Sequence, residues 1–176
     1  MNHFPEFNYL IDPIRNLDFK DPNLTNEELQ IALLFLDDAI KLDLQNNYEC
    51  IYEAHLLRGQ VHSLMGNYHK SINDFKKAIS IKPNSYISIL ELGKAKINLG
   101  FFEDGYSDLI QAIMLNNEDP NLFYLKGEVE FISGFYKEAI NTFDNLLNKF
   151  PENIFLIKKA KNLKIIIEDN LKYYKK

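Results

Sequence analysis

Cysteine is almost absent from this sequence, which contains only Cys50. A single thiol cannot close a disulfide within the chain, and no second cysteine stands at the spacing of a metal-ligand pair. We therefore expect a reducing compartment. We interpret Cys50 as a small apolar residue, because no motif for a nucleophile surrounds it.

Long apolar runs are also missing. The first six residues lack the basic start and the continuous apolar stretch of a secretory signal, and no run reaches the length of a membrane span. These absences predict a soluble, cytoplasmic protein. The 176 residues, of which 46% are hydrophobic, still suffice for one folded domain or one short solenoid.

The common catalytic motifs are absent too. The sequence has no glycine-rich phosphate loop, no Gly-x-Ser-x-Gly elbow and no His-Glu-x-x-His. Its neighbouring carboxylates, at 27–28, 37–38 and 103–104, are explained by solvation and by helix dipoles. We therefore predict no enzymatic activity, no cofactor and no small-molecule substrate.

The net charge of −5 gives no general reason to expect nucleic acid, because affinity for phosphates comes largely from clustered lysine and arginine. One region departs from this average, since residues 158–176 contain seven lysines against Glu168 and Asp169. An acidic protein, a nucleic acid or an anionic membrane could meet such a stripe. The outer face of a terminal helix must also be polar, and no arginine or interleaved aromatic suits bases, so nucleic acid is disfavoured.

Glycine is present in small number but in a regular pattern. Six of the seven glycines form two series with a step of 34 residues. The series are Gly59, Gly93, Gly127 and Gly66, Gly100, Gly134. A fixed period of this length indicates a repeat architecture.

Each period is predicted to contain two helices. In the first, residues 52–64 and 69–81 have helical apolar spacing, with a break at 66–67 and a stop at 82–84. A glycine within a helix, such as Gly59, costs about 1 kcal/mol relative to alanine, so we expect close approach of the partner helix there. Gly66 suits the left-handed turn that ends a helix.

The repeat resembles the tetratricopeptide-repeat (TPR) family. The first period carries the resemblance best, through His55, Arg58-Gly59, His62, Gly66-Asn67-Tyr68, Ser71, Phe75, Ala78 and Pro83. The third period has Phe123, Lys126-Gly127, Gly134-Phe135-Tyr136, Ala139, Phe143 and Pro151. The second departs most, with Gly105 in place of Ala and Asn117 in place of Pro, which bears on how tightly that unit packs.

The resemblance implies an all-α, right-handed α-solenoid of TPR helix hairpins. The expected parts are an irregular apolar N-terminal segment at 1–24, a half-repeat helix at 25–46, TPR units at 52–85, 86–119 and 120–153, and a basic capping helix at 154–176. A capping-box start at residues 25–28 opens the half-repeat helix, whose first-helix partner is missing.

Prolines exclude one long helix in residues 1–24, yet the segment is rich in apolar residues. We expect it to pack on this protein, in place of the missing first helix, or on a partner. In the second case it could form a homodimer.

Three histidines, His55, His62 and His69, are spaced seven residues apart. Helical zinc ligands usually lie three or four residues apart, whereas two turns separate imidazoles by roughly 10 Å. His55 and His62 also occupy positions where the TPR repeat has packing aromatics. We therefore predict packing roles and no metal site.

In TPR proteins the first helices line a concave groove that binds peptides or helices of partners. The resemblance assigns this groove twelve residues in ladders that step by 34. They are Glu53, Ile87, Asn121; Leu56, Leu90, Tyr124; Gln60, Lys94, Glu128; and Ser63, Ile97, Phe131. We expect about half of the apolar members to pack between neighbouring helices instead.

The resemblance thus implies a non-catalytic protein-protein interaction module that binds a peptide or helix of a partner. TPR domains that clamp the acidic C-terminus of heat-shock chaperones use Lys, Arg and Asn along the groove, and Lys94 is the only cation in these ladders. That subtype is disfavoured. Two alternatives remain: a small secretion-type or assembly chaperone, similar in layout, and a self-associating structural solenoid.

Overall fold

The computed structural model describes residues 5–17, 19, 21, 23–42 and 47–173. Within these ranges the chain forms helices and no strands. The helices are α1 Pro5–Arg15, α2 Asn26–Lys41, α3 Tyr48–Leu64, α4 Tyr68–Ile81, α5 Tyr86–Asn98, α6 Phe102–Leu115, α7 Pro120–Ile132, α8 Tyr136–Lys149 and α9 Ile154–Tyr173.

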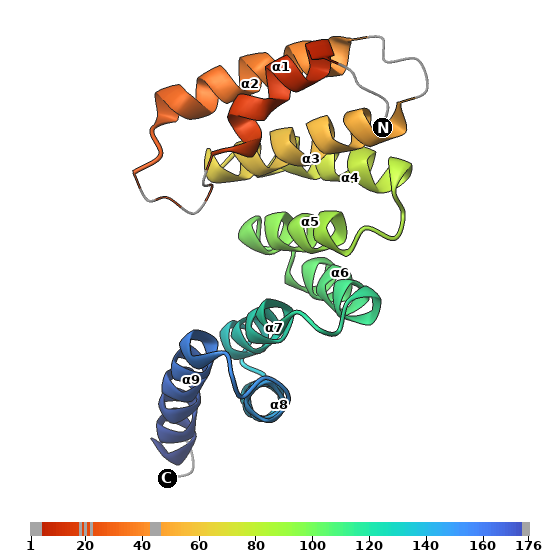
Figure 1. Cartoon of the computed structure of the whole chain (residues 1–176). Helices are drawn as coiled ribbons and strands as arrows, with labels where there is room; N and C mark the ends of the chain where they lie inside the picture. The colour runs from red at the N-terminus through yellow and green to blue at the C-terminus, as the bar shows by residue number, and fades with distance from the viewer. Residues whose placement is uncertain (1–4, 18, 20, 22, 43–46, 174–176) are drawn as a thin grey trace.

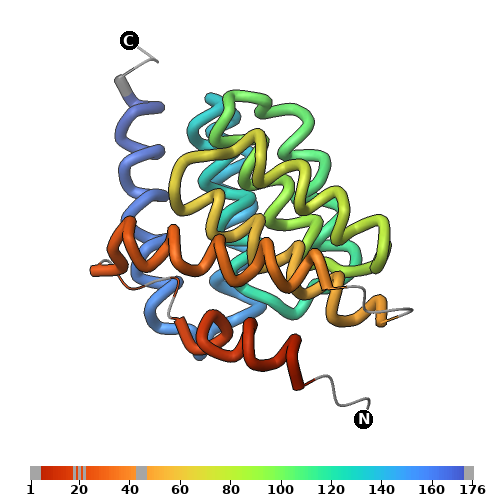
Figure 2. Tube along the Cα trace, turned by 90° about the horizontal axis from the view of Figure 1, so that it is seen from above, coloured from red at the N-terminus to blue at the C-terminus, as the bar shows by residue number. Residues whose placement is uncertain are grey.

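The helices follow one another as stacked hairpins, with the two ends of the chain at opposite ends of the stack (Figure 1). Figure 2 looks along the stack, so that the hairpins lie over one another. The fold is an all-α solenoid of stacked helix hairpins, as the sequence predicts. The pairs α3–α4, α5–α6 and α7–α8 fall in the three expected units, although α3 begins earlier than expected, at Tyr48.

The glycines within the first helices stand where two helices meet closely, as predicted. A Cβ added at Gly59 would lie 2.6 Å from Cε1 of Phe75, and one at Gly127 would lie 2.5 Å from Cε1 of Phe143. Each phenylalanine ring is fully buried and occupies the space that the missing side chain leaves. The ring's burial compensates for the poor helix propensity of glycine.

The second unit is packed closely in spite of its departures from the repeat. A Cβ at Gly93 would lie 2.9 Å from the carbonyl oxygen of Gly105, and one at Gly105 would lie 2.7 Å from the carbonyl oxygen of Gly93. Two facing glycines therefore bring the backbones of α5 and α6 together. The substitution of glycine for alanine at 105 favours close packing here rather than loosening the unit.

The second glycine series ends the first helices. Gly66, Gly100 and Gly134 have φ values of +73°, +85° and +82°. These are left-handed conformations, and at each position the following N–H closes the helix, as Asn67 does by donating to the carbonyl of His62 at 2.8 Å. This is the predicted helix-ending turn.

The N-terminal segment is not irregular throughout, because residues 5–15 form helix α1. Pro5 stands at the first helical position, where its missing N–H costs nothing, and Pro13 is accommodated within the helix. The proline argument against one long helix thus missed a short one. Helix α1 is stabilised by the burial of its apolar face.

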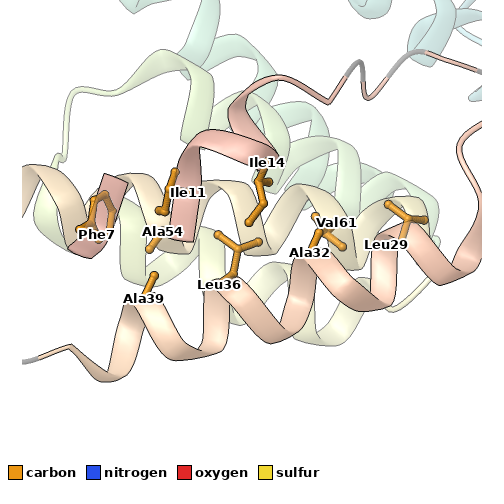
Figure 3. Packing of buried hydrophobic residues seen from close by; sticks show 9 residues of the cluster. All are labelled: Phe7, Ile11, Ile14, Leu29, Ala32, Leu36, Ala39, Ala54 and Val61. Atoms are coloured by element: carbon orange, nitrogen blue, oxygen red, sulfur yellow. The ribbon is translucent and has the colours of Figure 1, made fainter. Parts of the chain in front are cut away.

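This face packs on the protein itself. Phe7, Ile11 and Ile14 are buried against α2 and α3, in a cluster that Figure 3 shows in detail. The cluster comprises Phe7, Ile11, Ile14, Leu29, Ala32, Leu36, Ala39, Ala54 and Val61. Helix α1 therefore takes the place of the first-helix partner that α2 lacks in sequence.

Helix α2 begins with the predicted capping box. The Glu28 N–H donates to Oγ1 of Thr25 at 3.2 Å, and the Thr25 N–H donates to Oε2 of Glu28 at 2.8 Å. The helix ends at Lys41, short of the expected 46, and residues 43–46 lie outside the described residues.

Helix α9 packs against α8 and α7 at the C-terminal end of the stack. Leu156, Ala160 and Ile167 form its buried face. It reaches Tyr173, and the last three residues of the expected capping helix lie outside the described residues. Among the described helices, none combines the length and apolar composition needed to cross a membrane.

Candidate binding groove

The twelve predicted groove residues lie on the three first helices, α3, α5 and α7. The structure brings three of them, Gln60, Ser63 and Lys94, together around one cavity of about 300 Å³. Phe19, Leu64, Glu91 and Asn98 complete its lining. The cavity therefore spans the first two units and the segment between α1 and α2.

The apolar members of the groove are more buried than expected. Ile87 is exposed, whereas the other five pack partly against the core clusters: Leu56, Leu90, Ile97, Tyr124 and Phe131. The expectation that about half would pack in this way was therefore too low. Burial of this kind leaves only the edges of these side chains for a partner.

The polar members of the candidate groove contribute little net charge. The Lys94 ammonium group donates to both carboxylate oxygens of Glu91, at 2.8 and 3.0 Å, from the same face of α5. Asn121 is exposed, and Gln60 and Ser63 are half-buried. The centre of the groove thus offers hydrogen-bonding groups with little net charge.

Glu53, one of the candidate groove residues, forms an ion pair with α1. The Arg15 guanidinium donates to both oxygens of Glu53, each at 2.5 Å, and also to Asp12 at 2.6 Å. The hydrogen bond with Glu53 holds the pKa of Arg15 above its ordinary value. Glu53 is therefore occupied by this protein and is not a free acceptor for a ligand.

The surroundings of Tyr124 are aromatic and basic. Lys159 of α9 places its ammonium nitrogen 5.6 Å from the centre of the Tyr124 ring and 4.6 Å from that of Phe155. Burial, followed by a hydrogen bond with Glu128, raises the pKa of the Tyr124 hydroxyl, so it remains a neutral donor. Helix α9 thus places a side chain on Tyr124, one of the candidate groove residues.

Two of the three spaced histidines, His55 and His62, are partly or wholly buried. His55 Nδ1 lies 2.9 Å from Oδ1 of Asp74, and Arg58 donates to both oxygens of that carboxylate at 2.7 and 3.0 Å. Burial alone would raise the pKa of Asp74, but the hydrogen bonds from His55 and Arg58 hold it below its ordinary value. His62 is buried, and His69 is exposed.

Among the described residues, no group of three or more His, Cys, Asp or Glu side chains is placed to hold a metal ion.

Sequence reasoning missed seven residues at this site: Arg15, Phe19, Leu64, Glu91, Asn98, Phe155 and Lys159. A signal existed for Asn98, because Leu64, Asn98 and Ile132 form a further ladder with the step of 34. Glu91 stands three residues before Lys94 on one helix face, which is also readable. Arg15 and Phe19 depend on where α1 docks, and the repeat carries no information about that.

Residues 52–85 match the family model described as tetratricopeptide repeat. A curated relative, tetratricopeptide repeat protein 37 of Xenopus laevis, is 28% identical over 105 residues. That alignment covers 60% of this chain but only 7% of the relative, so the chain spans a small part of the relative's length.

Solved structures share the fold. A crystal structure of MamA protein has a TM-score of 0.68 and 21% identity, over 97% of this chain and 88% of that one. The first TPR of Spaghetti (RPAP3) bound to the HSP90 peptide SRMEEVD has a TM-score of 0.60 and 21% identity, over 68% of this chain and 92% of that one. At these identities the likeness concerns the fold.

Proposed function

We propose that this chain, whose residues 52–85 match the tetratricopeptide-repeat family model, binds a segment of a partner polypeptide in the groove along α3, α5 and α7. One observation carries the proposal. Gln60, Ser63 and Lys94, assigned to the groove from the repeat alone, meet around a cavity of about 300 Å³ that also has an aromatic wall, Phe19. Concave sites with apolar walls and a few polar groups are typical of binding sites.

The chemistry of the groove suits an amphipathic segment. Lys94 is paired with Glu91, and Glu53 with Arg15, so neither pair attracts one sign of charge strongly. Partly exposed edges of Leu90 and Ile97 offer apolar contact between these pairs. A helix or extended peptide with one apolar face and neutral polar groups fits best.

A related TPR domain is bound to an HSP90 peptide, which supports peptide binding as a use of this fold. We do not extend that ligand to this chain. Its one ladder lysine already donates to both oxygens of Glu91, and a terminal carboxylate would have to compete with that pair.

The role that follows is an adaptor or a dedicated chaperone, non-catalytic and acting in the cytoplasm. Helix α9 extends the groove by Phe155 and Lys159, so the partner can run the length of the stack. A dimer through the N-terminal segment would have to use other residues than Phe7, Ile11 and Ile14, which are buried in this protein's own core.

The test is capture of a partner with Ile87→Glu, at the most exposed apolar groove residue. Met114→Glu is the matched control, because Met114 is 80% exposed on α6, outside the groove. Both variants should melt like the native chain, since neither residue is buried. We expect Ile87→Glu to lose proteins that the native chain and Met114→Glu capture from the native cell. Equal capture by all three chains would refute the groove as the site.

A further inference from the structure

A second cavity lies outside the groove. It has a volume of about 330 Å³ and is formed where the start of α6, the end of α7 and the turn before α8 meet. Phe102, Val129 and Phe135 supply its apolar walls. None of the residues that line it belongs to the twelve groove residues, so it is a separate surface, here called the edge pocket.

The floor of the edge pocket is a buried carboxylate whose hydrogen bonds are complete. Glu130 is 3% exposed and accepts hydrogen bonds from Tyr106 Oη at 2.7 Å, from Lys126 Nζ at 2.5 Å and from Thr142 Oγ1 at 2.6 Å. The ammonium group of Lys126 is therefore paired with Glu130 and does not offset the charge of other carboxylates at the pocket.

The rim of the edge pocket is acidic. Glu103 lines it, and Glu138 stands in the first turn of α8, three residues after Phe135, which also lines the pocket. Among the described residues, no Lys, Arg or His lies within 4 Å of the Glu103 or Glu138 carboxylates. The exposed apolar residues Phe101 and Ile132 precede the lining residues Phe102 and Ser133 in the sequence. An apolar pocket with unpaired carboxylates fits a segment that has lysines next to aliphatic residues.

The chain itself carries such a segment on α9. Ile154, Lys158, Lys161 and Ile165 follow one another at steps of four, three and four residues, which places them on one face of the helix. All four are exposed, with Ile154 at 78%, and they lie opposite the buried face of α9. Neither lysine has a carboxylate within 4 Å among the described residues. We call this face the α9 stripe.

The charge of the chain is divided in the same way, with a basic C-terminal end and an acidic remainder. Seven lysines against two acids give residues 158–176 a net charge of +5, so the net charge of −5 leaves −10 for the rest. Within one molecule the α9 stripe lies at the end of the stack, and α7 and α8 stand between it and α6 (Figure 1). The stripe of one copy is thus free to approach the pocket of another, and electrostatics favours that orientation.

We propose that the α9 stripe of one copy docks in the edge pocket of a second copy, so that the protein associates head to tail. The aliphatic residues Ile154 and Ile165 meet the phenylalanines of the pocket, and Lys158 and Lys161 meet Glu103 and Glu138. The two surfaces differ, so the contact is heterologous, and it continues into a ring or a chain of copies.

The test combines charge reversal with mixing. The pocket variant is Glu103→Lys with Glu138→Lys, and the stripe variant is Lys158→Glu with Lys161→Glu. Sedimentation velocity at rising concentration and low salt should show the native chain exceeding the mass of one copy, 20.6 kDa. Each variant alone should remain monomeric, because both of its surfaces then have the same sign.

An equimolar mixture of the two variants should associate again, since each acidic surface then finds a basic one. Lys70→Glu with Lys77→Glu changes the net charge as the stripe variant does, on the exposed face of α4, and should associate like the native chain. Raising the salt to about 1 M, where the Debye length falls to about 3 Å, should shift the native chain toward the monomer.

A native chain that stays monomeric at every concentration would overturn the proposal, and the acidic pocket would then be left to a basic segment of a different protein. Association of the stripe variant alone, or its failure to recover in the mixture, would equally refute this pairing of surfaces. The melting temperatures of all variants serve as the check on folding, because every substituted residue is exposed.

Discussion

The contact between Gly59 and Phe75 gives the sharpest test of how the repeat packs. An alanine Cβ at 59 would lie 2.6 and 2.8 Å from two atoms of a ring that is fully buried, whereas ordinary carbon contacts are about 3.5–4.0 Å. Displacing such a ring costs typically about 1–3 kcal/mol. Alanine gains about 1 kcal/mol of helix propensity. We therefore expect Gly59→Ala to lower the free energy of unfolding by up to about 2 kcal/mol.

The cause can be separated from other effects by a double-mutant cycle. Phe75→Leu replaces the ring by a smaller side chain. The equivalent position in the second unit already holds a leucine, Leu109. Alone it should destabilise by about 0.5–3 kcal/mol, because space is left beside Gly59. In the double variant the new methyl group occupies part of that space. We expect the double variant to be more stable than the sum of the single effects by about 1 kcal/mol.

Urea unfolding followed by far-ultraviolet circular dichroism measures all four chains. Gly66→Ala is the control, because a Cβ there meets nothing within 4 Å and the cost comes only from its φ of +73°. That substitution should cost about 1–2 kcal/mol and should add independently to Phe75→Leu. If Gly59→Ala stabilised the protein by the full propensity gain, or if the cycle showed no coupling, the close-approach explanation would be wrong.

Two further outcomes follow from the buried residues. Burial lowers the pKa of His62 from its ordinary value of 6.5, so the unfolded chain binds a proton more readily than the folded one. The free energy of unfolding should therefore fall as the pH drops below 6.5. In urea titrations at different pH, His62→Gln should reduce this dependence of the free energy on pH. Phe7→Ala should cost about 3–5 kcal/mol and lower the melting temperature, whereas the exposed Tyr9→Ala on the same helix should change it little.

The sequence predicted those parts of the fold that depend on local chemistry. A left-handed turn at Gly66 and a capping box at Thr25 each need only a few neighbouring residues, and both were correct. Helix α1 was missed, because the prolines of residues 1–24 were given more weight than the spacing of Phe7, Ile11 and Ile14. That spacing is the amphipathic pattern of a short helix.

The repeat predicts which candidate groove residues share a helix face, but it does not predict how exposed each of them is. A step of 34 identifies which positions share a helix face, and the twelve residues do lie on α3, α5 and α7. How far Tyr124 is covered depends instead on where Lys159 and Phe143 lie, and these belong to other helices. Such contacts differ from unit to unit, so the residues that are repeated in every unit do not predict them.

The buried polar contacts between paired helices show how this variation is organised. Positions 62, 96 and 130 are equivalent in the repeat, as are 74, 108 and 142, yet they hold His, Lys, Glu and Asp, Asp, Thr. In the second unit the Lys96 ammonium lies 2.6 Å from Asp108, whereas in the third the carboxylate has moved to the first helix, as Glu130. Each unit thus keeps one largely buried carboxylate with a cation beside it, in a different arrangement.

This variation has a structural consequence. An uncompensated buried charge is strongly destabilising, so the second helix of one unit is a poor partner for the first helix of another. Pairing α7 with α4, for example, would place the carboxylates of Glu130 and Asp74 side by side, where they would share Lys126 of α7 because Arg58 belongs to α3. The shared glycines and phenylalanines would permit many pairings of these helices. We infer that the differing polar residues select the native one, which is the order in which the hairpins are stacked.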